Sequence, residues 1–288
     1  MYHKENLHIT GSQETIPMGR AMIISAQFTV GGGQNASDFI LLPFVNGRRW
    51  GAHERPDADG CATFHIPLPN PGPAHIQVAA LKSDTQHWMG LDIQKHLLLA
   101  GRPLPANMDG VLSNIIEANV TWREIKPHDS SDTLFCMQWE PWFTGGVDRW
   151  RTAQAVPLFG FYDSYNSAVT RQHMLWFMDL GVDCLLADWT NHLWGKTHWN
   201  QRSGHVNTLV HATTLALETM ATMRDEGLPV PKMVLFPGLS NGRPTTMEAL
   251  NEELDWVYHN YLRNPRFDDL WQIYDGKPLI VVLDTGAV

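Results

Sequence analysis

The stretch NSAVTRQHMLWFMDLGVDCLLADWT, residues 166–190, contains the two patterns that decide the fold of the C-terminal half. Its first part places large side chains at helical spacing, and Gly181 follows in the position of a helix C-terminal cap. The residues on the predicted helical face are Val169, His173, Trp176, Phe177 and Leu180. The apolar run 182–187 then predicts a buried strand. A helix followed directly by a buried strand is the repeating unit of an α/β domain.

The same alternation continues on both sides of this stretch. Further buried strands are predicted at 133–139, 233–236 and 279–283. Helices are predicted over 206–226 and from the capping-box sequence Thr245-Thr-Met-Glu248 onward. This β-α-β-α-β-α-β order requires parallel strands with right-handed crossovers, in a barrel or in an open sheet. The long loops predicted after the first two strands favour the barrel, because barrel enzymes build their sites there.

Residues 21–125 instead alternate apolar and polar side chains, which predicts strands with one buried face. Gly- and Pro-rich turns such as 56–60 separate these runs. We therefore expect an immunoglobulin-like antiparallel β-sandwich over 1–125, a linker at 126–132 and an incomplete (β/α)₈ barrel over 133–288. The alternating positions are Met22, Ile24, Ala26, Phe28 and Val30, then Ala62, Phe64, Ile66 and Leu68, then Ile76, Val78 and Ala80.

Composition excludes several classes of protein. The 288 residues carry 30 acidic and 21 basic side chains, a net charge of −9, and the basic residues do not cluster. This balance argues against a nucleic-acid partner. No apolar run approaches the roughly 20 residues of a membrane-spanning helix, so no membrane partner is expected.

The cysteines and the N-terminus bear on the compartment. Cys61, Cys136 and Cys184 are far apart in sequence and lack metal-site spacing, which predicts small buried residues and no disulfide. Residues 1–12 lack the apolar core of a secretory signal. A cytoplasmic protein is expected unless the N-terminus is incomplete.

Tryptophan is the most informative residue type, with twelve in the chain. Half of them fall within or beside the first two predicted strand-end loops. Tryptophan suits stacking on the C–H face of a sugar ring, although aromatic loops can also simply pack over a barrel mouth. The six residues are Trp139, Trp142, Trp150, Trp189, Trp194 and Trp199.

Carboxylates end the predicted strands at the same edge. They are Glu140, Asp188 and Asp284. Glycoside cleavage characteristically uses two carboxyl groups, one as acid and one as base or nucleophile. Asp188 could instead cap a turn, and Asp284 could bind backbone N–H groups in the Asp-Thr-Gly stretch. The histidines lack the H-E-x-x-H pattern and no phosphate-binding loop is present, so no metal or cofactor is expected.

Three segments together resemble the endo-α-mannosidase-like glycoside hydrolases of family 99 and the related family 71. They are CMQWEPWF (136–143), PLFGFYDSYNSAVTRQHMLWFMDLGVDCLLADWTN (157–191) and VYHNYLRNPRFDDLWQIYDGKPLIVVLD (257–284). The carrying motifs include the aromatic-Pro-Trp-aromatic run ending at Phe143, the Tyr162-Asp-Ser turn and the Gly276-Lys-Pro approach to a strand. The resemblance implies a barrel that hydrolyses α-linked glycans with retention, a carboxylate assisting attack by the sugar 2-hydroxyl.

Two departures limit what the resemblance implies. The chain has Asp188-Trp-Thr-Asn191 where relatives usually show Ser-Trp-Trp-Gly. The family's catalytic glutamates lie in the later part of the barrel, which would fall beyond Val288. We therefore expect a truncated barrel and an inactive 288-residue chain.

The sequence thus predicts a glycoside hydrolase-like protein whose partner is a carbohydrate. Glu140 and Asp188 are the candidate catalytic acids. The predicted sugar-binding residues are Trp139, Trp142, Tyr162, Trp189 and Asn191. The alternatives are a non-catalytic carbohydrate-binding or adhesion protein, and an open α/β domain with a small-molecule ligand.

Overall fold

The computed structural model describes most of the chain, in two compact units. The described residues are 5–11, 14–83, 98–106, 110–128, 133–143, 150, 153–190, 206–238 and 246–283. The first unit comprises residues 1–123 and 145–172, and the second comprises 124–144 and 173–288.

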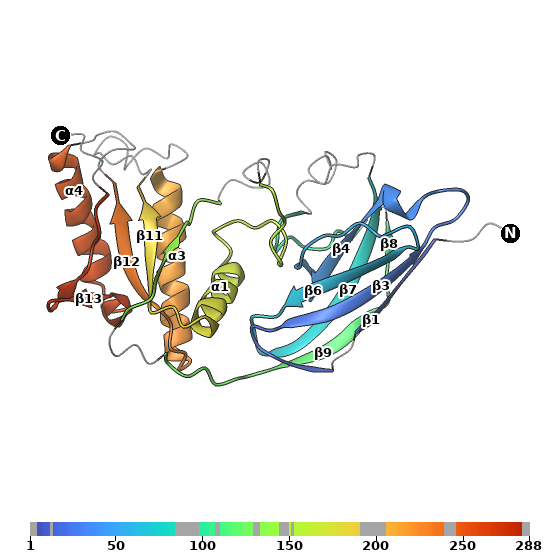
Figure 1. The fold of residues 1–288 in the computed structure, drawn as a ribbon, viewed down its shortest axis with the longest axis horizontal. Coiled ribbons are helices and arrows are strands. Elements are labelled where there is room, and N and C mark those ends of the chain that lie inside the picture. Colours follow the sequence, from blue (N-terminus) through green and yellow to red (C-terminus); the bar gives the residue numbers. More distant parts are fainter. Residues whose placement is uncertain are drawn as a thin grey trace. The chain divides into compact units, whose positions relative to one another are not determined.

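The first unit is a β-sandwich of two sheets (Figure 1). One sheet is antiparallel, in the order β1-β3-β6, with β1 at Asn6–Gly11, β3 at Ala21–Thr29 and β6 at Cys61–Pro67. The other has the order β2-β9-β7-β4-β5, with β8 pairing β7. Its strands are β2 (Thr15–Pro17), β4 (Phe39–Val45), β5 (Arg48–Arg49), β7 (Gly72–Lys82), β8 (Val111–Leu112) and β9 (Ile116–Thr121). The predicted sandwich is confirmed.

Alternation fixes which side chains form the sandwich core. In β3, Met22, Ile24, Ala26 and Phe28 are at most 3% exposed, while the residues that alternate with them, 23, 25 and 27, are exposed. The predicted turn at 56–60 ends at Gly60, which has φ +81°. A Cβ there would lie 2.0 Å from the Phe28 carbonyl oxygen, so only glycine fits this close approach.

One segment of the first unit comes from the middle of the chain. The backbone N–H of Ala52 donates to the Leu158 carbonyl at 2.7 Å, and that of Ala100 donates to the Phe161 carbonyl at 2.7 Å. Residues 158–161 thus add backbone pairing to the sandwich unit. The sequence instead predicts these residues as part of a loop that follows a barrel strand.

The second unit is built on a parallel sheet. It has the order β10-β11-β12, with β10 at Cys136–Trp139, β11 at Cys184–Trp189 and β12 at Lys232–Pro237. Isolated parallel bridges also join Leu235 of β12 to Ile280, and Gly238, which directly follows β12, to Leu283. The other elements of this unit are α3 (Val206–Asp225), α4 (Met247–Val257), the π-helix Tyr258–Leu262, the 3₁₀ turn Asp268–Leu270, and the hairpin β13 (Ile273–Tyr274) to β14 (Lys277–Pro278). Helix α1 (Ser167–Asp179) runs from the first unit into the second, and a 3₁₀ turn at Ala36–Asp38 belongs to the first unit.

Three of the four predicted strands and the predicted helices therefore exist near their predicted places, whereas the predicted strand 279–283 forms only isolated bridges. The Thr246 side chain caps α4 by accepting a hydrogen bond from the Ala249 N–H at 3.2 Å, as the capping-box sequence predicts. Gly181 follows α1 with φ +72°, as a C-terminal cap requires. Leu180 is wrong as a core residue, because α1 ends at Asp179 and Leu180 is 62% exposed.

The cysteine prediction is also wrong. Cys136 and Cys184 form a disulfide across the first two parallel strands. They are direct partners in the strand register, with Cα atoms 4.6 Å apart. Cys61 is a free and exposed cysteine in β6. Strand pairing brings together two residues 48 positions apart, and no local spacing in the sequence reveals that pairing.

Candidate functional site

The carboxyl ends of β10 and β11 hold both predicted catalytic acids, each in a different environment. Glu140 follows β10 and is exposed, and its side chain makes no hydrogen bond or ion pair within the described residues. Asp188, in β11, is only 2% exposed. We call Gln138, Glu140, Trp142, Asp188 and Thr190 the strand-end site.

Asp188 connects the residues around it. One carboxylate oxygen accepts a hydrogen bond from the Gln138 side-chain amide of β10. The other oxygen accepts from the Thr190 backbone N–H at 2.8 Å and from the Thr190 hydroxyl at 2.6 Å. These bonds satisfy both oxygens of a buried carboxylate, as burial requires. Asp188 thereby fixes the turn after β11 against the neighbouring strand.

Trp142 joins the segment after β10 to Asp188. Its indole N–H donates to the Asp188 backbone carbonyl at 2.9 Å, and the side chain remains partly exposed. A tryptophan held through its N–H keeps a fixed ring orientation, which suits it to contact a flat apolar ligand face. The structure thus brings together Trp142 and Asp188, two of the residues that the sequence predicts for the site.

Trp189 occupies a different environment from the predicted one. It is 1% exposed, and its indole N–H donates to the Thr213 hydroxyl of α3 at 2.9 Å. Its ring also meets the edge of Tyr261, with centroids 6.2 Å apart. Trp189 is therefore a core residue between sheet and helices, and its ring has no open face for a sugar.

Trp139 lies on the same side of the sheet as Trp189. It pairs directly with Ala187, two residues before Trp189, and is 8% exposed. Side chains of directly paired residues share a face of the sheet, and that face repeats every second residue. Trp139 thus faces the helices as well.

Tyr162 belongs to the first unit. Its carbonyl accepts the Trp150 indole N–H at 2.9 Å, and its ring meets the edges of Trp150 and Phe159, with centroids 4.8 and 5.1 Å apart. Trp150 is 5% exposed, so this aromatic group is mainly core. The other predicted residues Asn191, Trp194, Trp199 and Asp284 lie outside the described residues.

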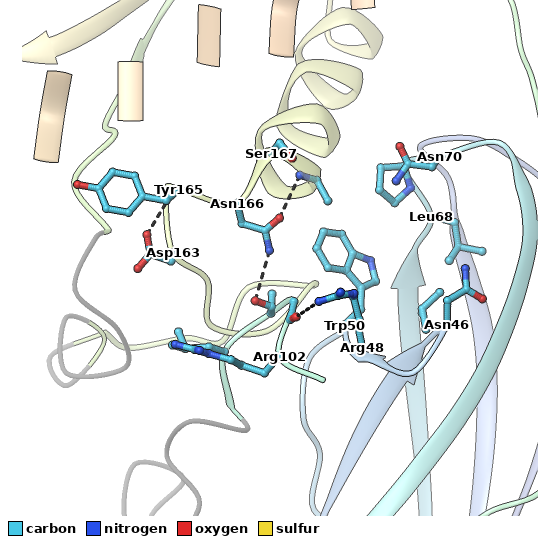
Figure 2. A pocket seen from close by; sticks show the side chains of 16 residues that line it. Asn46, Arg48, Trp50, Leu68, Asn70, Arg102, Asp163, Tyr165, Asn166 and Ser167 are labelled. Carbon is cyan, nitrogen blue, oxygen red and sulfur yellow. Dashed lines mark hydrogen bonds between the residues drawn. The ribbon is translucent and has the colours of Figure 1, made fainter. Parts of the chain in front are cut away.

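Sequence reasoning missed a pocket of about 640 Å³ in the first unit (Figure 2). We call it the arginine pocket, after Arg48 and Arg102 in its lining. The Arg48 guanidinium donates to the Gly101 carbonyl at 3.1 Å, which joins two walls that are 53 residues apart in sequence. No sequence motif spans such a distance. The other polar lining residues are Asn46, Asn70, Asp163, Tyr165, Asn166 and Ser167.

Tyr165 and Asp163 form the acidic side of this pocket. The Tyr165 backbone N–H donates to the Asp163 carboxylate at 2.9 Å. Burial, and then the nearby Asp163 charge, raises the pKa of Tyr165, so the phenol is neutral at physiological pH. Among the described residues that line the pocket, Asp163 therefore carries the one negative charge.

The described residues also bear on metal binding and on membrane insertion. They contain no group of three or more His, Cys, Asp or Glu side chains that could hold a metal ion. Among the described helices, none is both long enough and apolar enough to cross a membrane.

No family model and no curated protein matches this sequence. Among solved structures, the chain is similar to the CARDB domain of a protein from Pyrococcus furiosus, solved in complex with di-metal ions, at 11% identity and a TM-score of 0.26. That match covers 42% of this chain and 94% of the other. It is also similar to the D0-D1 domain of intimin, at 16% identity and a TM-score of 0.25, covering 41% of this chain and 49% of the other.

Proposed function

We propose that the chain is a glycoside hydrolase-like protein that binds α-linked glycans at the carboxyl ends of β10 and β11. The observation that carries this proposal is the strand order. β10, β11 and β12 are neighbours in chain order, and the segment containing Ile280 and Leu283 bridges to β12. An open doubly wound sheet reverses its order at a switch point, whereas a barrel adds each strand beside the last. The order therefore favours a β/α-barrel plan.

The faces of the sheet support the same plan. Trp189 contacts α3, so alternation places Leu186 and Asp188 on the opposite face. In a barrel that opposite face is the interior, and polar side chains at its carboxyl end form the site. Asp188 occupies this position, with Gln138 from the neighbouring strand bonded to it.

The roles follow from the environments of the two acids. Asp188 is buried and its carboxylate accepts three hydrogen bonds, so its role is structural. Its backbone carbonyl also holds Trp142 in place. Glu140 is exposed and its side chain is unengaged within the described residues, so it can bind sugar hydroxyls directly. Trp142 supplies a ring of fixed orientation for stacking. Trp189 is omitted from the sugar-binding set because it is a core residue.

The disulfide bears on where this function operates. Disulfides persist mainly in oxidising compartments. The Cys136–Cys184 bond therefore favours action outside the cytoplasm, in contrast to the expectation from residues 1–12. Extracellular glycans are accessible in such a compartment.

Binding and turnover of α-mannan oligosaccharides test the proposal. We expect calorimetry to detect binding that Trp142→Ala and Glu140→Gln each weaken at least fivefold. Trp122→Ala is the matched control, because Trp122 is 47% exposed and lies in the first unit. We expect no hydrolysis by this chain. Absence of binding, or equal loss with the control variant, would exclude the strand-end site as a glycan site.

The second candidate is a non-catalytic carbohydrate-binding protein, and the arginine pocket is the observation that favours it. The same titrations separate the two candidates. Binding that survives both strand-end substitutions would assign carbohydrate recognition to the first unit.

A further inference from the structure

The arginine pocket has the size of a ligand site and lies apart from the strand-end site in sequence and in unit. Its volume of about 640 Å³ is within the range typical of small-molecule pockets. Trp50, Leu68 and Leu99 supply apolar surface, and polar side chains surround it (Figure 2).

The polar side chains fall into two groups according to their bonding. Asn46 and Asn166 are engaged with backbone groups, Asn46 accepting from the His75 N–H at 2.8 Å and Asn166 donating to the Ala100 carbonyl at 3.3 Å. These two amides hold the walls. By contrast, the side chains of Arg102 and Asn70 make no hydrogen bond or ion pair within the described part of the chain. Their donors are available to a ligand.

The charge of the pocket is opposite to that of the whole chain. Among the described lining residues, Arg48 and Arg102 supply two guanidinium groups and Asp163 supplies one carboxylate, while the whole chain carries a net charge of −9. Arg48 uses one amino group on the Gly101 carbonyl, and no bond within the described residues engages the rest of its guanidinium. A locally positive pocket in a negative protein selects anionic ligands from solution.

We propose that the arginine pocket binds a carboxylate-bearing sugar, such as a uronic acid unit of an acidic oligosaccharide. The guanidinium fork matches a carboxylate in geometry and charge, which a neutral sugar cannot exploit. Arg102 and the free donors of Arg48 bind the carboxylate, and Asn70 binds ring hydroxyls. The choice of a saccharide rests on the proposed function, whereas the choice of an anion rests on the pocket alone.

Titration calorimetry of the full chain with trigalacturonate tests this proposal. We expect measurable binding, and we expect Arg102→Ala and Arg48→Ala each to weaken it about tenfold or more, because each removes charge-assisted hydrogen bonds. Arg263→Ala is the matched control, since it removes an equally exposed positive charge in the second unit. A neutral galactose trisaccharide that binds as tightly as trigalacturonate would overturn the proposal.

Asp163→Asn tests the proposal through an expected gain of affinity, which an unfolded variant cannot show. Asparagine keeps an oxygen that accepts the Tyr165 N–H, and it removes the one negative charge carried by the described lining residues. We expect trigalacturonate to bind this variant about two- to fivefold more tightly, because the repulsion between the Asp163 carboxylate and the ligand carboxylates is removed. This size matches the Coulomb energy of a pair of charges near a protein surface. Unchanged or weaker binding to a folded variant contradicts an anion site.

Two further measurements test whether the ligand must be a sugar and whether it binds in the arginine pocket. Citrate binding as tightly as trigalacturonate would overturn the choice of a sugar. Glu248→Gln should leave trigalacturonate affinity unchanged, because Glu248 is exposed in the other unit and lines neither proposed site. If α-mannan fails to bind while trigalacturonate binds with the expected arginine dependence, the proposed strand-end function fails and the pocket proposal stands as an independent anionic-sugar site.

Discussion

The two units bury their strands in different ways. In β3 of the sandwich, buried and exposed side chains alternate strictly, because one face meets the core and the other meets solvent. In β11 of the parallel sheet, five of six residues are buried, so neither face is open along its length. Alternation states directly which side chains point inward. A continuously buried strand does not, and this difference decides which functional residues can be recognised from sequence.

The largest expected effect tests whether Trp189 is core. Trp189→Ala should lower the free energy of unfolding of the second unit by about 3–5 kcal/mol, the cost of removing a fully buried aromatic ring. Chemical denaturation followed by far-ultraviolet circular dichroism measures it. Phe28→Ala is the comparison in the first unit, where a ring that is 1% exposed should cost a similar amount. A loss under about 1 kcal/mol for Trp189→Ala would mean that the indole lies at an open surface after all.

The second largest expected effect is the stability that the Cys136–Cys184 disulfide contributes to the second unit. Cys136→Ala with Cys184→Ala removes a cross-link that closes a loop of 48 residues in sequence separation. We expect the second unit to lose about 2–4 kcal/mol, and a reducing agent to have the same effect on the unmutated chain. Calorimetric melting with and without reductant measures this loss.

Cys61→Ala is the control for the disulfide, since Cys61 is exposed in β6 of the sandwich. It should change stability by less than about 0.5 kcal/mol, because the exposed thiol, a weak donor, makes one hydrogen bond to the Gln27 side-chain oxygen at 3.1 Å. Equal destabilisation of the sandwich on reduction would show that the disulfide does not act on the second unit alone.

Trp189 and the Cys136–Cys184 disulfide show which features of the fold can be predicted from sequence. The sandwich, the parallel strands and the helices of the second unit could be predicted, since each depends on local periodicity and on caps such as Thr246 and Gly181. The Cys136–Cys184 pair could not, because it depends on strand register between distant segments. The sequence predicts Trp189 as a site residue because its position at a strand end is visible in sequence, whereas the direction of its ring is not.

The same reason explains the outcome for the sites. Asp188 and Trp142 could be predicted as strand-end residues, and the structure joins them. The arginine pocket could not, because Arg48 and Arg102 follow no motif and come together only through tertiary structure. Its free donors become evident once the bonds of the neighbouring amides are known.

Acid should act on the sandwich through His53. Burial, and then the positive charges of Arg49 and Arg55, lower the pKa of His53 to about 3. The unfolded chain takes up a proton near pH 6.5, while the folded chain does not until about pH 3. The stability contributed by neutral His53 is therefore complete above pH 6.5 and is lost as pH falls from 6.5 towards 3. At pH 5 the loss should be about 2 kcal/mol.

Denaturant titrations at pH 7 and pH 5 measure this loss, with His53→Phe as the variant. Phenylalanine retains an aromatic ring beside Phe161, which His53 meets edge-on at 5.4 Å, and it cannot titrate. The pH dependence of the sandwich transition should fall by about 2 kcal/mol in this variant, whatever its stability at pH 7. An unchanged difference between the two pH values would assign the acid sensitivity elsewhere. Burial also lowers the pKa of His173 to about 4, so the second unit should keep its own acid sensitivity.

The smallest expected effect is at Glu140, and it distinguishes a residue kept for binding from one kept for folding. Glu140→Gln should change the unfolding free energy by less than about 0.5 kcal/mol, because the side chain is exposed and unengaged within the described residues. Asp188→Asn should cost about 1–3 kcal/mol, since an amide nitrogen replaces a buried acceptor and leaves a donor in the network unsatisfied. If both variants also lose glycan affinity, only the loss at Glu140 can be assigned to direct contact. A clear destabilisation by Glu140→Gln would instead place that carboxylate among the structural groups, and Trp142 alone would remain as a direct glycan contact at the strand ends.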